Sequence, residues 1–540
     1  MTDVLLVQPP IRDFYLTAKR TIPYGLASIA AALVARGFSV EILDALASSK
    51  SRPLPLPPEM SDLEKFYGRP DVSPFALFNR FRHFGSSFDA IGRKARESGA
   101  WLVGISALFT PYAEEALATA AAIKSRHPDG TIVMGGHHAT AMPEHVLTSP
   151  SVSYVLRGEG EVSLPLLAES LRDHRPLADI PGIAFRRPDG GLHVNPPAAM
   201  ASPDRFPLPA LDLLDRRHYR RNGRGSAVVV ASRGCPLRCS YCSVGGAPWL
   251  AYRLRPVPRV VAEIETAVVR HNAGFIDFED ENLSLDRGWF LELLQEIRRR
   301  FGERALELRA MNGLFPPTLD ETVVTAMAGT GFKALNLSLG STHAGQLRRF
   351  HRPDVRAAFD RALDLAERFA LAAVGYIIVG APHQSPEESV DDLLFLAERR
   401  VLAGVSVFYP APGSPDFDLC RRLDLLPGSL GRMRASALPI EHTTRRIESV
   451  TLLRLGRVLN FMKYLLDHGL SMPAASPSDA VASDPGDRIE TGRSLLSRFL
   501  SDGRIQGLTP DGMLYDHHVA PRLCERFLSG LRKITLRGTA

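Results

Sequence analysis

The chain has 540 residues, which is too long for one ordinary domain and predicts two large domains with an additional region. Its net charge is +6, but the basic residues are mostly scattered arginines that alternate with acids, so we expect no nucleic-acid surface. No stretch approaches about 18 uninterrupted apolar residues and residues 1–13 lack a signal-peptide pattern, so we expect no membrane span and no export. The 5 cysteines favour a reducing cytoplasm over a disulfide framework.

The first part of the chain alternates apolar strands with helices. We expect strands at residues 4–7, 40–46, 101–106, 131–135 and 154–157, and helices at 23–36, 88–98, 112–126 and 163–172. Residues 51–74 are polar and rich in proline and predict a loop or an insertion. This alternation predicts an α/β domain over residues 1–182, with a flavodoxin-like doubly wound parallel sheet whose ligands bind beyond the carboxyl ends of the strands.

A short connection follows. Residues 183–187 and 192–195 flank the turn sequence Pro-Asp-Gly-Gly and predict a hairpin. Residues 196–209 are proline-rich and predict a linker. We therefore assign residues 183–222 to a hairpin and linker.

The next part of the chain repeats strand–helix units. Strands are expected at residues 227–231, 275–279, 306–310, 334–339, 374–379 and 405–409, with helices such as 259–271, 288–301, 320–329 and 355–369 between them. Such units predict a partial (β/α)6 barrel over residues 223–420, with its chemistry at the carboxyl ends of the strands. Residues 421–540 predict a mainly helical region with helices at 446–468, 489–500 and 521–531 and a loop at 473–487.

A cysteine triplet lies directly after the first barrel strand. Cys235, Cys239 and Cys242 form the pattern C-x3-C-x2-C, and the other two cysteines lie far away in sequence. Thiolates select iron–sulfur clusters, zinc or copper(I), whereas structural zinc sites and ferredoxin clusters use four ligands. Three ligands on one loop therefore suggest a [4Fe–4S] cluster with one open iron. A zinc site completed by a histidine or by Cys420 is the alternative.

This segment, with Tyr241 just before the third cysteine, resembles the radical S-adenosylmethionine (radical SAM) superfamily, in which the open iron binds SAM. The resemblance implies further SAM contacts at the barrel strand ends. By the same resemblance, the second strand binds the amino group, the fourth the ribose and carboxylate, and the fifth the adenine. The residues concerned are Asp280, Glu281 and Asn282; Ser338 and Ser341; and Ile377 and Gly380. A carboxylate after a strand is also a frequent helix cap, so each residue alone is a weak signal.

A second motif lies at the strand ends of the first domain. Ser106 and Leu108 follow the third strand and Gly135-Gly136 the fourth, with 26 residues between the two groups. They resemble the S-x-L…G-G half of the cobalamin-binding signature, which implies that these four residues surround the nucleotide tail of cobalamin. The D-x-H-x-x-G half is missing, so we expect no histidine of this chain on cobalt. An inherited fold that has lost its cobalamin is the alternative.

Together the motifs resemble the radical SAM enzymes with a cobalamin (B12)-binding domain, over residues 1 to about 420. The resemblance implies three cofactors: a [4Fe–4S] cluster, SAM and cobalamin. It implies methylation of an unactivated carbon of a small molecule, by a 5′-deoxyadenosyl radical that removes a hydrogen atom and by methyl transfer from methylcobalamin. A reductant such as flavodoxin or ferredoxin would supply the electron. Cyclisation, oxidation or rearrangement without methyl transfer is the main alternative; a cobalamin or SAM sensor without turnover is a third, against which the intact triplet argues.

Overall fold

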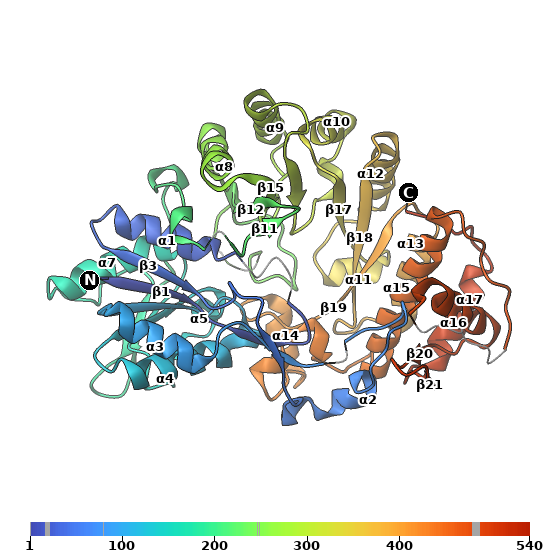
Figure 1. The fold of residues 1–540 in the computed structure, drawn as a ribbon, viewed down its shortest axis with the longest axis horizontal. Helices are drawn as coiled ribbons and strands as arrows, with labels where there is room; N and C mark the ends of the chain where they lie inside the picture. Colours follow the sequence, from blue (N-terminus) through green and yellow to red (C-terminus); the bar gives the residue numbers. More distant parts are fainter. Residues whose placement is uncertain are drawn as a thin grey trace.

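The computed structural model describes residues 2–16, 22–78, 80–215, 217–245, 247, 249–477 and 486–539 (Figure 1). Residues 17–21, in the segment searched for an axial histidine, and residues 478–485, in the expected C-terminal loop, lie outside this description.

The first domain is built on a seven-stranded sheet in the order β10-β9-β8-β7-β6-β1-β3. Its parallel strands are β1 (Val4–Gln8), β3 (Val40–Asp44), β6 (Leu102–Ser106), β7 (Thr131–Gly135) and β8 (Tyr154–Leu156). Their order β3-β1-β6-β7-β8 confirms the flavodoxin-like prediction. The hairpin of β9 (Ile183–Arg186) and β10 (Leu192–Val194) pairs antiparallel with β8, so the sheet continues past residue 182.

Helices cover both faces of this sheet, as the strand pattern requires. Successive strand residues point to opposite faces. In β1, Leu6 therefore packs with α1 (Tyr24–Val34) and α7 (Gly160–Arg172), whereas Leu5 packs with α3 (Phe88–Ser98) and α4 (Ala113–Arg126). Two short helices, α5 (His137–Ala141) and α6 (Pro143–Val146), follow β7.

The proline-rich stretch at 51–74 is more ordered than a loop. It contains β4 (Ser51–Pro53), a 3-10 turn at Pro58–Leu63 and α2 (Glu64–Tyr67). β4, β5 (Arg82–Phe84) and β2 (Ile11–Asp13) form a small sheet. Phe75 is fully buried beside Phe461 of α15 (Arg446–Asp467), their ring centroids 5.7 Å apart. Within the stretch, the carbonyl oxygen of Phe66 accepts a hydrogen bond from Arg454 of α15 at 3.1 Å, so a helix far away in sequence supports it.

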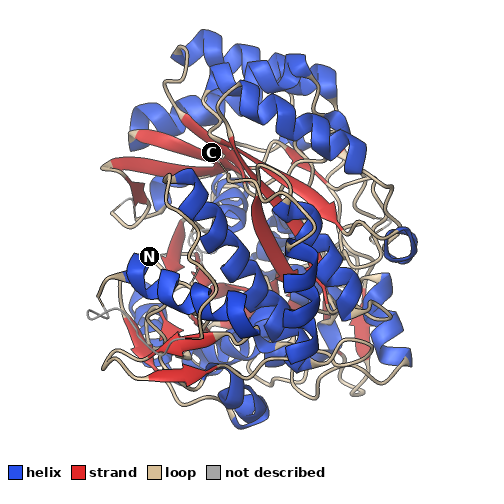
Figure 2. Cartoon of the chain, turned by 90° about the vertical axis from the view of Figure 1, so that its right-hand side faces the viewer, coloured by secondary structure: helices blue, strands red, loops and turns tan. Residues whose placement is uncertain are grey.

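Six parallel strands form the predicted partial barrel, in two sheets. They are β12 (Arg224–Val229), β15 (Ala273–Phe278) and β16 (Glu307–Ala310), then β17 (Ala334–Gly340), β18 (Ala372–Val379) and β19 (Leu402–Val407). Isolated bridges at Leu308–Phe332 and Leu314–Leu337 join the sheets. The outer layer consists of α8 (Val257–His271), α9 (Arg287–Phe301), α10 (Glu321–Thr330), α12 (Arg356–Arg368) and α13 (Pro386–Ala397). Figure 1 shows α8, α9, α10 and α12 along the top, and Figure 2, turned by 90°, shows helices above the strands there.

The C-terminal region is mainly helical, as predicted, with α15, α16 (Arg488–Asp502) and α17 (Pro521–Leu531) beside the barrel (Figure 1). A hairpin of β20 (Gln506–Leu508) and β21 (Leu514–Asp516) was not predicted. Arg434 donates hydrogen bonds to the carbonyl oxygens of Arg12 in β2 (2.6 Å) and of Pro111 in the turn after β6 (2.8 Å), so this region ties those two segments together. Among the described helices, none has the length and apolar composition needed to cross a bilayer.

Candidate functional site

A cavity of about 340 Å³ lies between the carboxyl edge of the first sheet and the barrel. The residues after β1, β6 and β7 line it from one side, and Val230, Arg233 and Glu281 line it from the barrel side. Its inner end is apolar and reaches Leu6 and Val133, on the sheet face that α1 and α7 cover. Both domains therefore supply walls of one cavity.

The four residues expected to contact cobalamin all lie on this cavity. Ser106 and Leu108 line it after β6, and Gly135 and Gly136 line it after β7. Leu108 is 37% exposed although it is apolar. Gly136 has a φ of +115°, and an added Cβ would lie 2.6 Å from the carbonyl oxygen of Ala107, so the backbone itself requires glycine there.

Two other glycines are not explained by protein atoms. Gly25 lies in the first turn of α1 on the cavity wall, and an added Cβ would meet nothing within 4 Å. At Gly135 the nearest atom to an added Cβ is the carbonyl oxygen of Leu156, at 3.5 Å. A helical glycine is about 1 kcal/mol less favourable than alanine, so its presence at 25 is a cost without a packing reason. Open space beside Gly25 suits a bulky ligand that approaches the backbone, and a corrinoid is such a ligand.

The two histidines after the glycine pair differ in their surroundings. His138 is buried and hydrogen-bonds Thr110 Oγ1 (3.2 Å) and His145 Nδ1 (3.1 Å), and burial lowers its pKa to about 4. His137 is exposed and lines the cavity. Partial desolvation by the cavity walls and the charge of Arg233 lower the pKa of His137. His138 thus supports the loop after β6, and His137 faces any occupant of the cavity.

The cysteine loop is closed at its base by a two-stranded ribbon, β13 (Ser232–Arg233) paired with β14 (Arg253–Leu254). Gly234 has a φ of +77°, and an added Cβ would lie 2.5 Å from the carbonyl oxygen of Ala251. The chain can therefore enter the loop at this point only with glycine. Gly234 also lines the cavity, which places the start of the cysteine loop on its wall.

Contacts with the barrel ends hold the middle of the loop. Ser240 Oγ lies 2.9 Å from the carbonyl oxygen of Arg349 and 3.0 Å from the Asp416 carboxylate. Burial raises the pKa of Cys235 and of Cys242, and the neighbouring thiols and Glu281 add to the rise. Bound iron would reverse this trend, because a metal ion deprotonates a coordinating thiol. Three thiols held together on one fixed loop suit an iron–sulfur cluster.

No group of three or more His, Cys, Asp or Glu side chains within the described ranges converges on a position for a metal ion. The thiolates of a cluster each bind a different iron atom and need not meet at one point.

The three residues after β15 have different roles. Asp280 is buried, accepts hydrogen bonds from Ala231 N (3.2 Å) and Ser232 Oγ (2.5 Å), and so braces the turn after β12. Its burial raises its pKa to about 6. Glu281 lines the cavity near Cys235 and Cys242, whereas Asn282 is buried. Of the three, Glu281 is placed to meet a ligand.

The predicted residues on β17 and β18 do not all face the cysteine loop. Ser338 Oγ lies 3.3 Å from Arg352 Nη2, beside the loop. Ser341 accepts a hydrogen bond from His343 N at 3.2 Å. Ile377 is fully buried in the barrel core, and an added Cβ at Gly380 would lie 2.9 Å from Ser449 Oγ of α15.

Arg352 is a candidate functional residue that sequence reasoning missed. Its guanidinium donates to Tyr241 Oη (2.8 Å) and to the carbonyl oxygen of Ser338 (3.0 Å), and Nη1 lies 3.9 Å from Cys239 Sγ. Tyr241 also packs edge-on against Phe350, with ring centroids 5.0 Å apart. Arg352 and Cys239 are 113 positions apart, and no local motif marks the arginine. Only the fold brings it to the end of β17, where it contacts Ser338.

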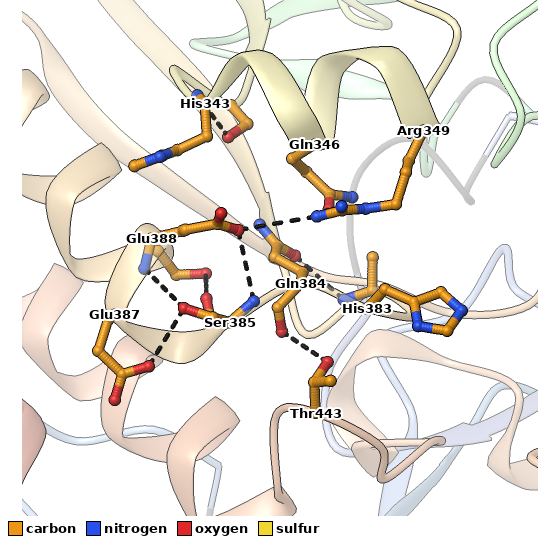
Figure 3. A network of polar contacts seen from close by, with 12 residues as sticks. His343, Gln346, Arg349, His383, Gln384, Ser385, Glu387, Glu388 and Thr443 are labelled. Carbon is orange, nitrogen blue, oxygen red and sulfur yellow. Dashed lines mark hydrogen bonds and ion pairs between the residues drawn. The ribbon is translucent and has the colours of Figure 1, made fainter.

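Ser240 donates its hydrogen bond to the last residue of α11 (Ala344–Arg349). A polar network holds this helix in place (Figure 3). Arg349 donates to Gln346 Oε1 (2.7 Å) and lies 3.8 Å from Glu388. Glu388 forms a capping box with Ser385 at the start of α13. The loop after β18 is also held, since Thr443 donates to the carbonyl oxygen of Gln384 at 2.8 Å (Figure 3). The support of the cysteine loop thus extends to the C-terminal region.

Comparison with known proteins agrees with this arrangement. Residues 79–168 match the family model described as a B12 binding domain, and residues 229–396 match that of the radical SAM superfamily.

Several curated proteins are similar in sequence. An uncharacterized methyltransferase of Pyrococcus horikoshii, PH0819, is 26% identical over 61% of this chain and 71% of its own length. Cytidylyl-2-hydroxyethylphosphonate methyltransferase of Streptomyces wedmorensis is 24% identical over 76% of this chain and 79% of its own. The anaerobic magnesium-protoporphyrin IX monomethyl ester cyclase of Rubrivivax gelatinosus is 29% identical over 53% of this chain and 52% of its own.

Two solved structures share the fold. The radical SAM methyltransferase TsrM from Kitasatospora setae superposes with a TM-score of 0.59 at 20% identity, covering 78% of this chain and 76% of that one. The cobalamin-dependent SAM radical enzyme OxsB gives a TM-score of 0.63 at 14% identity, covering 93% and 72%. The chain therefore carries a B12-binding domain followed by a radical SAM domain.

Proposed function

We propose that this enzyme is a cobalamin-dependent radical SAM methyltransferase that methylates an unactivated carbon of a small molecule. One observation carries the proposal: Ser106 and Gly135 of the first domain line the same cavity as Gly234 and Glu281 of the barrel. A methyl donor and a radical generator that share one cavity are close enough for a transfer that is effectively unimolecular. The methyltransferases among the relatives support the same activity.

In this proposal the chain's own residues bind and orient the reactants. Cys235, Cys239 and Cys242 would hold the cluster, and Arg352 would pair with the SAM carboxylate, because a guanidinium matches a carboxylate in two hydrogen bonds. Glu281 would accept hydrogen bonds from the SAM ammonium group. When bound, the cluster and SAM would supply a carbon-centred radical and cobalamin a methyl group.

The cavity glycines, with Ser106 and Leu108, would receive the cobalamin. Residues 1–182, 183–222, 223–420 and 421–540 remain our proposed division into a cobalamin domain, a connection, a barrel and a C-terminal region.

The proposed reaction needs one electron for each SAM that is cleaved, so we propose a small donor such as flavodoxin or ferredoxin as a partner. All 5 cysteines are free thiols in the structure, which suits a reducing compartment, and we place the enzyme in the cytoplasm. We also propose that nucleic acids are not among its partners.

The test uses SAM with a deuterated methyl group and anaerobically reconstituted, cobalamin-loaded enzyme. A product that gains the labelled methyl, with matched amounts of 5′-deoxyadenosine and S-adenosylhomocysteine, supports methylation. Cell extract supplies candidate substrates.

The cyclase among the relatives favours a second candidate, a radical cyclisation or oxidation without methyl transfer. Substrate-dependent 5′-deoxyadenosine without label transfer, from enzyme that carries cobalamin, would support this candidate and refute methylation. If neither 5′-deoxyadenosine nor a labelled product forms with any extract, both candidates fail in favour of a sensor.

A further inference from the structure

The ribbon at the base of the cysteine loop has an unfavourable charge pattern of its own. Arg233 on β13 lies directly opposite Arg253 on β14. Like charges at opposite positions of an antiparallel pair repel and destabilise it. The ribbon therefore needs acidic partners from outside the loop.

The B12-binding domain supplies both partners at the start of α7. Arg253 lies 2.9 and 3.0 Å from the two carboxylate oxygens of Glu159. Arg233 lies 2.5 Å from Glu161 and 3.4 Å from Glu159. The carboxylate side chains are only 4% and 6% exposed, and the two arginines 24% and 16%. Two positive and two negative charges thus neutralise each other in a nearly closed space.

The linker passes through the same cluster. Arg253 Nη1 donates to the carbonyl oxygen of Met200 (2.7 Å), and Met200 N donates to Glu159. Glu159 N donates to the carbonyl oxygen of Ala198 at 2.9 Å. At Gly158, φ is +86° and an added Cβ would lie 2.2 Å from that same oxygen, so only glycine allows this approach. Sheet domain, linker and cysteine loop are joined at one point.

This point borders the cavity, because Glu159, Glu161 and Arg233 all line it. We propose that these residues and Arg253 form a positioning joint. Through this joint the B12-binding domain fixes the position of the base of the cysteine loop relative to the cavity. The two proposed cofactor sites therefore keep a fixed separation. The inference rests on the proposed pair of sites, but the joint itself can be tested without turnover.

The test is hydrogen–deuterium exchange of the purified full-length protein under anaerobic conditions. Glu159→Gln and Glu161→Gln should each speed exchange of the amides in β13 and β14 about tenfold, because removing one partner leaves a charge uncompensated in a buried site. Exchange in β7 should stay unchanged. Glu169→Gln is the matched control: it lies on the same helix and pairs with Arg36 at 2.7 Å, but does not line the cavity.

Reversing the charges at positions 233 and 161 distinguishes a positioning joint from a contact that only supports the fold. Arg233→Glu alone should loosen the ribbon, since it places a third acid beside Glu159 and Glu161. Combined with Glu161→Arg, it re-forms the ion pair between positions 233 and 161 with the charges reversed and should restore wild-type exchange. Hydroxocobalamin should slow exchange in β13 and β14 of the wild type, and Glu161→Gln should lose this protection.

Unchanged ribbon exchange in both single glutamine variants would overturn the inference, as would a double charge exchange no better than Arg233→Glu alone. Protection of the ribbon by hydroxocobalamin that persists in Glu161→Gln would also overturn it. The exchange measurements without hydroxocobalamin depend neither on cobalamin binding nor on methyl transfer, so the two proposals can fail separately.

Discussion

Gly25→Leu should block cobalamin binding without harming the fold. Gly25 lines the cavity, and the space where its Cβ would stand is empty of protein atoms within 4 Å. A leucine there projects into space that the proposed ligand needs. Gly428→Leu is the matched control, because Gly428 is exposed, also has open space around an added Cβ, and does not line the cavity.

The two effects of the substitution have opposite signs. Leucine is a better helix former than glycine by up to about 1 kcal/mol, so the free energy of unfolding without ligand should stay equal or rise. Forced overlap in a packed site typically costs about 1–3 kcal/mol, which corresponds to a Kd for hydroxocobalamin roughly 5- to 150-fold higher. Ligand at 100 times the wild-type Kd stabilises the wild type by about 2.7 kcal/mol, but a variant with tenfold weaker binding by only about 1.4 kcal/mol.

The assay compares denaturant unfolding with and without hydroxocobalamin for the wild type and both variants, with the Kd taken from an absorbance titration. We expect a loss of ligand stabilisation in Gly25→Leu and wild-type behaviour in Gly428→Leu. Wild-type affinity in Gly25→Leu would refute the reasoning that the cavity at α1 receives the corrinoid.

Further predictions follow from the same structure. The triple variant Cys235→Ala/Cys239→Ala/Cys242→Ala should lose about four irons per chain after anaerobic reconstitution, and irons that persist would refute the cluster assignment. Cob(II)alamin in the wild type should show no nitrogen superhyperfine splitting in electron paramagnetic resonance; such splitting would contradict the absence of a histidine ligand. Arg352→Lys should raise KM for SAM more than it lowers kcat, since lysine cannot make the planar two-bond contact; an unchanged KM argues against a carboxylate contact. Burial raises the pKa of Glu115 from 4.5 to about 7. The folded state then binds more protons than the unfolded state between these values, so stability falls as pH rises from 4.5 to 7, by up to about 3 kcal/mol. Glu115→Gln should flatten that dependence in urea unfolding from pH 4.5 to 8, and an unchanged slope would contradict it.

The sequence by itself determined the two domain types and much of the proposed chemistry. Strand–helix alternation is a local pattern, because each strand and helix carries its own apolar period, and both the parallel sheet and the barrel follow from it. The cysteine triplet and the two halves of the S-x-L…G-G motif are local as well, because each is recognised from a few neighbouring residues. Each motif follows a strand, and the carboxyl ends of parallel strands share one edge.

Which strand-end side chains face a ligand was not readable from position alone. Asp280 and Glu281 are neighbours, yet one braces a turn and the other lines the cavity. Ile377 lies in a predicted adenine motif, and its side chain is buried in the barrel core. Alternation sends successive side chains in different directions, and the packing of the adjoining elements decides which direction is the core.

Tertiary structure alone brought together groups that are distant in sequence. Arg352 reaches Cys239 from 113 positions away, and Glu159 meets Arg253 from 94. The proline-rich stretch at 51–74 contacts a helix near the other end of the chain, where Arg454 donates to the carbonyl oxygen of Phe66 at 3.1 Å. Such contacts depend on how complete domains dock. That docking is set by the summed burial of apolar surface and the pairing of buried charges over the whole molecule, which no local segment contains.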